Sequence, residues 1–189
     1  DQGLSQAWSE VLNPEPSVLL LPGSRPPEAY ANWSLIMQVI QQLPEEIELV
    51  AAISPTLELP RLQAQIPAGL SVHLRVADFA WCVQRTMVAL AMAGTATEQC
   101  VGLGKPVVTM PGKGPQFTPA FAEAQTRLLG SSIFLRTVDT AAATLLDLIQ
   151  RMRSDPAFTT QLQEHGLKRM GVPGAADRIA NQILTWLKN

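Results

Sequence analysis

Residues 92–111 (MAGTATEQCVGLGKPVVTMP) contain residue types whose spacing could bind a charged group. Gly94 can adopt backbone angles closed to other residues. Thr95 follows it where the N-cap of a helix would lie, and Glu98 comes three residues later. The first turn of that helix would direct free N–H groups and the positive end of its dipole at whatever lies above it, which suits a phosphate. A capping box inside an ordinary α/β sheet would have the same sequence, so both interpretations stand at this point.

A second unusual turn follows the first continuous apolar run of the chain, SVLLL at Ser17–Leu21. The sequence after this run is PGSRPPE, which places Gly23, Ser24 and Arg25 directly beyond the expected strand. An Arg guanidinium group can bind phosphate oxygens, but an Arg in a turn is otherwise an ordinary surface residue. The importance of Arg25 therefore depends on whether its turn lies near residues 94–99 in the folded chain.

Short apolar runs alternate along the chain with patterns of helical period, as in a sheet buried on both faces. This alternation predicts an α/β fold, a Rossmann-like doubly wound parallel sheet of about six strands with a helical C-terminal tail. The commonest strand order, 3-2-1-4-5-6, places the first and fourth strands side by side and brings the two turns into one crevice. Besides the helix at Thr95, we expect strands at 17–21, 47–53, 72–76, 87–92, 107–110 and 132–135. We expect a helix that opens with Pro26 and Pro27 and runs to about Leu43, and further helices at 57–65, 77–85, 119–129, 139–153, 156–168 and 175–187.

The composition indicates one domain and excludes several classes of partner. Of the 189 residues 47% are hydrophobic, and the net charge of -2 gives no basic excess, so we expect no nucleic-acid partner. No apolar run is long enough to span a bilayer and no signal peptide is recognisable, so we expect a cytoplasmic location. Residues 1–16 are expected to form a leader or interdomain linker and residues 17–189 the domain. Because the sequence begins with Asp, we expect it to be part of a longer chain.

Several common catalytic and metal-binding motifs are absent. No GxGxxG follows a strand, GK at residues 104–105 lacks the P-loop spacing, and no G-x-S-x-G is present. His73 and His165 have no metal-ligand pattern around them, so we expect no metal and no cofactor. The sequence offers no evident catalytic base, since Asp78 would follow the third strand at the sheet edge, away from the first and fourth strands. Cys82 and Cys100 are expected to be buried free thiols.

Three short motifs, in the right order on the expected elements, resemble those of sugar-transferring enzymes. GSRPPE at residues 23–28 resembles the LPGSRxxE segment of lipid-A-disaccharide synthases. GTATEQ at residues 94–99, with GKP at 104–106, resembles the nucleotide-sugar motif of GT-B glycosyltransferases. The proline spacing that ends at Gln116 is similar to the P-x4-P-x4-Q run of UDP-glycosyltransferases. The resemblance covers about residues 18–129 together with the C-terminal tail.

The resemblance implies that the domain binds a UDP-sugar as donor substrate, with no further cofactor. The two turns would contact the diphosphate, an acidic residue would contact the ribose, and the Gln would lie near the donor sugar. The family's ribose-binding Glu falls seven residues before the proline of G-x-P, which is Gln99 here, with Glu98 one residue earlier. Pro119 also stands where Asn is common, which leaves the identity of the sugar open. The implied site residues are Gly23, Ser24, Arg25, Gly94, Thr95, Ala96, Thr97, Glu98, Gln99 and Gln116.

We therefore expect the donor-binding half of a GT-B glycosyltransferase, most like lipid-A-disaccharide synthase. It would transfer a hexosamine-type sugar to a lipid or sugar acceptor, and a second GT-B half would lie upstream. A lipid acceptor would bring the protein to a membrane surface. This half alone is expected to be inactive. Two alternatives remain: a UDP-sugar 2-epimerase-like enzyme of the same fold, and a non-catalytic nucleotide-binding or interaction domain.

Overall fold

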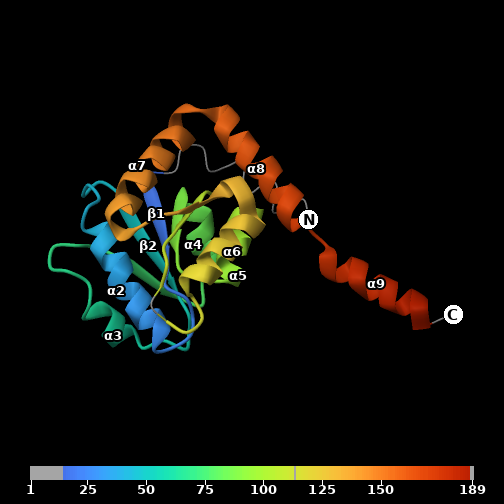
Figure 1. The fold of residues 1–189 in the computed structure, drawn as a ribbon, viewed down its shortest axis with the longest axis horizontal. Helices are drawn as coiled ribbons and strands as arrows, with labels where there is room; N and C mark the ends of the chain where they lie inside the picture. Colours follow the sequence, from blue (N-terminus) through green and yellow to red (C-terminus); the bar gives the residue numbers. More distant parts are fainter. Residues whose placement is uncertain (1–14, 113, 188–189) are drawn as a thin grey trace.

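The computed structural model describes residues 15–112 and 114–187, whose strands form one parallel sheet (Figure 1). The strand order is β3-β2-β1-β4-β5-β6, as expected for a doubly wound α/β fold. Val18 of β1 lies opposite Val88 of β4 in parallel register, which confirms the predicted pairing at the centre of the sheet. The strands are β1 (Ser17–Leu21), β2 (Glu48–Ile53), β3 (His73–Val76), β4 (Val88–Ala91), β5 (Val107–Thr109) and β6 (Ile133–Leu135).

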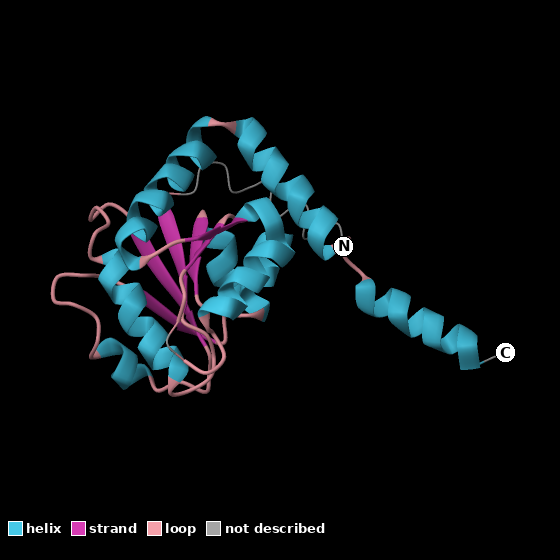
Figure 2. Cartoon of the chain, in the orientation of Figure 1, coloured by secondary structure: helices cyan, strands magenta, loops and turns pink. Residues whose placement is uncertain are grey.

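Helices cover both faces of the sheet (Figure 2). Residues of α2 and α7 pack on the face that includes Val18 and Leu20, and residues of α4 and α5 pack on the face that includes Leu19 and Leu21. Successive residues of a strand point to opposite faces, so β1 is buried on both sides and its sequence shows no polar alternation. The helices are α2 (Glu28–Ile40), α3 (Leu59–Gln63), α4 (Phe79–Arg85), α5 (Thr95–Gly102), α6 (Pro119–Leu129), α7 (Val138–Ser154), α8 (Pro156–Met170) and α9 (Ala175–Leu187).

Several helices differ from the expected bounds. The helix expected at 57–65 spans only Leu59–Gln63, α7 and α8 differ from expectation by one or two residues at their ends, and α2 and α4 differ for local reasons. The helix expected at 77–85 begins at Phe79, because Ala77 has a φ of 54° and cannot belong to a right-handed helix. The helix expected to open with Pro26 and Pro27 begins at Glu28, with Pro27 as its N-cap. It ends at Ile40 rather than Leu43, and a turn follows in which the Leu43 N–H donates to the Ile40 carbonyl at 3.1 Å. The leader or linker expected at 1–16 lies almost wholly outside the described residues.

The last helix, α9, extends away from the rest of the domain (Figure 1), so the expected helical C-terminal tail is confirmed. Its apolar side chains are exposed, from 46% at Ile183 to 77% at Leu187. None of the helices in the described chain combines the length and the apolar character needed to cross a membrane.

Candidate functional site

A cleft of about 670 Å³ lies at the edge of the sheet where β1, β2, β3 and β4 end. Its walls include the turns after these strands, the first turns of α2 and α5, and part of the loop between β5 and α6. The turn after β1 and the turn after β4 line the same cleft because their strands are neighbours. The expectation that these two turns share a crevice is therefore confirmed.

The turn after β1 lies very close to the end of β4. Gly23 has a φ of 95°, and a Cβ atom there would lie 3.1 Å from the Met92 carbonyl oxygen, so this position needs glycine. Asn32 of α2, only 1% exposed, donates from Nδ2 to the carbonyl oxygens of Pro22 at 3.0 Å and Met92 at 3.4 Å. One buried amide thus ties the two turns together, while Arg25 stays exposed in the cleft.

The turn after β4 leads directly into α5. Gly94 is the N-cap of this helix, and its carbonyl oxygen accepts from the N–H groups of Thr97 at 3.0 Å and Glu98 at 3.3 Å. The expected capping box is wrong, because Thr95 is already the first helical residue and no side chain caps this helix. The turn is held from α6 instead, where Gln125 Nε2 donates to the Gly94 carbonyl oxygen at 3.3 Å. The hydrogen bonds of α5 begin at the Thr97 N–H, so the N–H groups of Thr95 and Ala96 have no partner within the helix, and both residues line the cleft.

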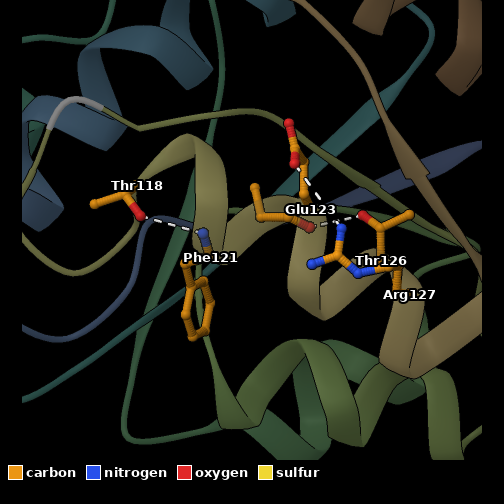
Figure 3. Close-up of polar contacts among 6 residues, drawn as sticks. Thr118, Phe121, Glu123, Thr126 and Arg127 are labelled. Atoms are coloured by element: carbon orange, nitrogen blue, oxygen red, sulfur yellow. Dashed lines mark hydrogen bonds and ion pairs between the residues drawn. The ribbon is translucent and has the colours of Figure 1, made fainter.

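The loop between β5 and α6 contributes the third wall. Arg25 Nη1 donates a hydrogen bond to Oε1 of Gln116, 91 residues away in the sequence. The loop runs into α6, whose N-cap Thr118 accepts from the Phe121 N–H through Oγ1 at 3.1 Å (Figure 3). A guanidinium group carries five N–H donors, so Arg25 keeps donors for an anion while it contacts Gln116.

The cleft brings together most of the residues that the sequence singled out. Thr97 is fully buried, and its Oγ1 donates to the Ala93 carbonyl oxygen at 2.7 Å, so it supports the turn from behind. Gln99 lines the cleft whereas Glu98 does not, because one residue is a rotation of about 100° around a helix. The geometry therefore favours Gln99 over Glu98 as the residue that faces a ligand. The expected residues that line the cleft are Gly23, Ser24, Arg25, Gly94, Thr95, Ala96, Gln99 and Gln116.

Asp78 also lines the cleft, contrary to the expectation that its edge position would keep it away. The strand order is as expected, but the cleft extends along the ends of β2 and β3. The left-handed backbone of Ala77 turns the chain toward β2, and the Ala77 N–H donates to the Ile53 carbonyl at 3.1 Å. Asp78 Oδ2 accepts from Arg75 Nη2 at 2.8 Å, so its carboxylate is paired in this arrangement.

Two further polar residues of the cleft, Glu28 and Asn32, were given no role at the site by sequence reasoning, although Glu28 ends the motif at residues 23–28. Both are buried on α2, at 8% and 1% exposure, and both contact the backbone of the cleft turns. A signal for them exists in the sequence, since two polar residues four positions apart interrupt the otherwise apolar buried face of this helix. Such residues need hydrogen-bond partners when they are buried.

The groups with clearly displaced pKa values lie outside the cleft. Burial raises the pKa of the Cys100 thiol to about 12 and lowers the pKa of Lys105 to about 8. Burial and the nearby Arg169 lower the pKa of His165. Cys82 and Cys100 are both buried and free, as expected.

No protein-family model matches this chain, and no curated protein matches it. Several solved structures do. A TarM variant from S. aureus, in complex with fondaparinux, α-GlcNAc-glycerol and UDP, is 11% identical with a TM-score of 0.62, over 93% of this chain and 36% of that one. The calicheamicin glycosyltransferase CalG4 is 18% identical with a TM-score of 0.57, over 94% and 44%.

The domain has the Rossmann-like fold of GT-B glycosyltransferases. A protein from Listeria monocytogenes assigned as a UDP-N-acetylglucosamine 2-epimerase is also similar, with 19% identity and a TM-score of 0.57 over 95% of this chain and 47% of that one. The chain thus spans about a third to a half of the length of these three structures.

Proposed function

We propose that residues 17–189 are the donor-binding half of a glycosyltransferase that transfers a hexosamine-type sugar from a UDP-sugar. The observation that carries this proposal is the shared cleft, in which Arg25 and the first turn of α5 come from two adjacent strands. A guanidinium group and a helix N-terminus both suit the negative charge of a diphosphate. The similarity to glycosyltransferases, one of them solved with UDP, supports the same interpretation.

Each wall of the cleft has a role in this proposal. The diphosphate binds between Arg25 and the backbone of residues 94–96, and the ribose lies beside Gln99, whose amide can hydrogen-bond hydroxyl groups. The donor sugar lies near Gln116. Negative charge builds up on the diphosphate as it leaves, and the same guanidinium group and helix N-terminus stabilise that charge.

The acceptor and the catalytic base belong to a second domain upstream in this proposal. Transfer needs a base for the acceptor's proton, and Asp78, the carboxylate at the far end of the cleft, is paired with Arg75 at 2.8 Å. We therefore expect residues 1–189 to bind UDP without turnover. The motif at residues 23–28 favours an acceptor like that of lipid-A-disaccharide synthase, which would bring the protein to a membrane surface.

A UDP-sugar 2-epimerase is the second candidate, favoured by the similarity to the Listeria protein. Such an enzyme would need several carboxylates around the sugar. Among the described residues only Glu28 and Asp78 supply carboxylates to the cleft, and both already contact other protein groups. A third candidate, a non-catalytic nucleotide-binding domain, differs from the first two in showing no turnover in any longer form of the protein.

Thermal unfolding with and without UDP tests the proposal. A ligand that binds only the folded state at about 100 times its Kd adds about 2.7 kcal/mol, which raises the Tm of a domain of this size by about 5–10 °C. No shift with UDP or with UDP-GlcNAc would contradict the proposal. In the full-length protein, the product formed from a UDP-sugar separates a transferase from an epimerase.

A further inference from the structure

The loop before α6 is anchored to the N-terminus of α2 by a buried carboxylate. Glu28, at 8% exposure, accepts through Oε1 from the backbone N–H groups of Gln116 at 3.1 Å and Phe117 at 2.5 Å. The partners Glu28 and Gln116 are 88 residues apart in the sequence. Hydrogen bonds to an ionised carboxylate are stronger than those to a neutral acceptor, so this contact is a firm anchor.

The loop lies so close to Glu28 that a side chain at Gly114 would not fit. A Cβ atom at Gly114 would overlap the Glu28 carboxylate. The loop is also closed on itself, because the Gly112 N–H donates to the Phe117 carbonyl oxygen at 3.0 Å. A Cβ atom at Gly112 would lie 2.6 Å from that oxygen. Gly114 therefore allows the close approach of the loop to Glu28, and Gly112 allows the loop to close on itself.

The anchor determines where Gln116 lies relative to Arg25. Arg25 lies three residues before Glu28 in the sequence, and its Nη1 donates to Gln116 Oε1. Gln116 is thus held twice, through its backbone by Glu28 and through its side chain by Arg25. The Arg25 contact is exposed, and an exposed hydrogen bond alone contributes little to holding a loop.

We propose that Glu28 is a positioning residue of the donor cleft, which fixes residues 114–117 so that Gln116 lies beside Arg25 and faces the sugar of a bound UDP-sugar. This inference rests on the proposed function, because Gln116 meets a sugar only if the cleft binds a UDP-sugar. UDP itself has no sugar. Loss of the anchor should therefore weaken the binding of UDP-GlcNAc and leave the binding of UDP nearly unchanged.

The experiment compares Glu28→Ala, Glu28→Gln and wild type by amide hydrogen exchange and by titration with UDP and UDP-GlcNAc. In Glu28→Ala, the amides of Gln116 and Phe117 should exchange about tenfold faster, because a hydrogen bond of about 1.4 kcal/mol is lost. The affinity for UDP-GlcNAc should fall about tenfold and that for UDP less than twofold. Glu28→Gln keeps an acceptor oxygen and should give intermediate values.

Two other variants separate positioning from general destabilisation. Gly114→Ala disrupts the same contact from the loop side, because its Cβ atom would overlap the Glu28 carboxylate. It should show the same selective loss of UDP-GlcNAc affinity, and it replaces Glu28→Ala as the test if that variant does not fold. Glu123→Ala removes a carboxylate from α6 just beyond the loop, where it is 60% exposed and lies 3.9 Å from Arg127 (Figure 3). This matched control should change neither amide exchange at residues 116–117 nor either affinity.

The two measurements keep this inference distinct from the proposed function. If wild type binds neither UDP nor UDP-GlcNAc, the proposed function is wrong. The role of Glu28 in a donor cleft is then wrong too, even if amide exchange shows that Glu28 holds the loop. If wild type binds both but exchange at Gln116 and Phe117 is unchanged in Glu28→Ala, the anchor is wrong. Equal losses of UDP and UDP-GlcNAc affinity would likewise overturn the positioning role. The inference stands when faster exchange and a selective loss of UDP-GlcNAc occur together.

Discussion

The two ends of the central strand pair, β1 and β4, use polar side chains in opposite ways. At the N-terminal end, Ser17, Thr86 and Lys105 are buried, at 0%, 1% and 5% exposure. Lys105 Nζ donates to the Thr86 carbonyl oxygen, and Ser17 Oγ accepts from the Met87 N–H at 3.2 Å. At the C-terminal end, the polar side chains of Arg25 and other turn residues remain exposed around the cleft.

This difference shows that the role of a polar side chain depends less on its residue type than on the end of the sheet at which it lies. At the N-terminal end, the side chains are taken up in completing the hydrogen bonds of the backbone. At the C-terminal end, two buried amides, Asn32 and Gln125, bond the turn carbonyls, so the exposed side chains are left for a ligand. Ligands of open α/β sheets bind at the C-terminal ends of the strands, where helix N-termini also lie.

The largest expected effect concerns Lys105 and should leave the cleft untouched. Burial lowers its pKa from 10.5 to about 8, so below pH 8 it is charged in both states and the full penalty of burying the charge is present. Between pH 8 and 10.5 the unfolded chain binds more protons, so this penalty is lost and stability rises with pH. The unfolding free energy of wild type relative to Lys105→Met should therefore rise by about 2–3 kcal/mol from pH 7 to 10.5.

Urea unfolding of both proteins at several pH values measures this difference. The contribution of Cys82 cancels because this thiol is present in both proteins. Lys105→Met also removes the nearby charge that lowers the pKa of Cys100, so the comparison reports Lys105 together with its effect on that thiol. The UDP affinity of Lys105→Met should equal that of wild type at pH 7. A difference between the two proteins that does not change with pH would contradict the burial of a charged Lys105.

The next prediction compares the two ends of the β1 and β4 pair by removing one buried polar side chain at each end. Asn32→Ala leaves two turn carbonyls without their donor and should cost about 2 kcal/mol of unfolding free energy. Ser17→Ala removes the bonds at the other end of β1 and should cost about 1 kcal/mol. Of these two variants, only Asn32→Ala should also weaken the binding of UDP, because Asn32 bonds the cleft turns and Ser17 does not. Calorimetric titration of both variants tests this, and equal UDP affinities would remove the distinction between the ends.

The smallest effect on stability and the most selective effect on binding are expected for Arg25→Ala. Arg25 is exposed, so the Tm should change by less than about 1 °C. The affinity for UDP should fall about tenfold, or about 1.4 kcal/mol, while that for uridine stays within about twofold, since a guanidinium group meets phosphate rather than base. Arg127→Ala, on the exposed face of α6, is the matched control. Similar losses for UDP and uridine would mean that Arg25 does not contact the diphosphate.

Features that depend on local pattern were predictable from the sequence. The bounds of β1, α6 and α9 agree with the expected ones because an apolar run, a Pro at a helix start and a clear helical period define them. The sheet order followed from a general rule for alternating strands and helices, and it was enough to bring Arg25 and residues 94–96 into one cleft.

Features that depend on contacts between distant residues were not predictable. The capping box at Thr95 fits its local pattern, but Gly94 takes the N-cap position, and Gln125 from another helix holds the turn. Glu28 is the last residue of a recognisable motif, yet its role follows only from a loop 88 residues away. Asp78 reaches the cleft because the residue before it has an unusual, left-handed backbone conformation. Residue spacing in the sequence does not predict such a conformation.

The central position of β1 also has a consequence for the order of events in folding. β1 can pair with β2, which follows it closely in the sequence, whereas its pairing with β4 joins residues such as Ser17 and Met87 that are 70 positions apart. Closing so long a loop carries a larger entropic barrier, and contacts of this kind slow folding. The cleft exists only once β4 has joined β1, so a refolding chain should gain tertiary structure in its first half before it can bind a nucleotide.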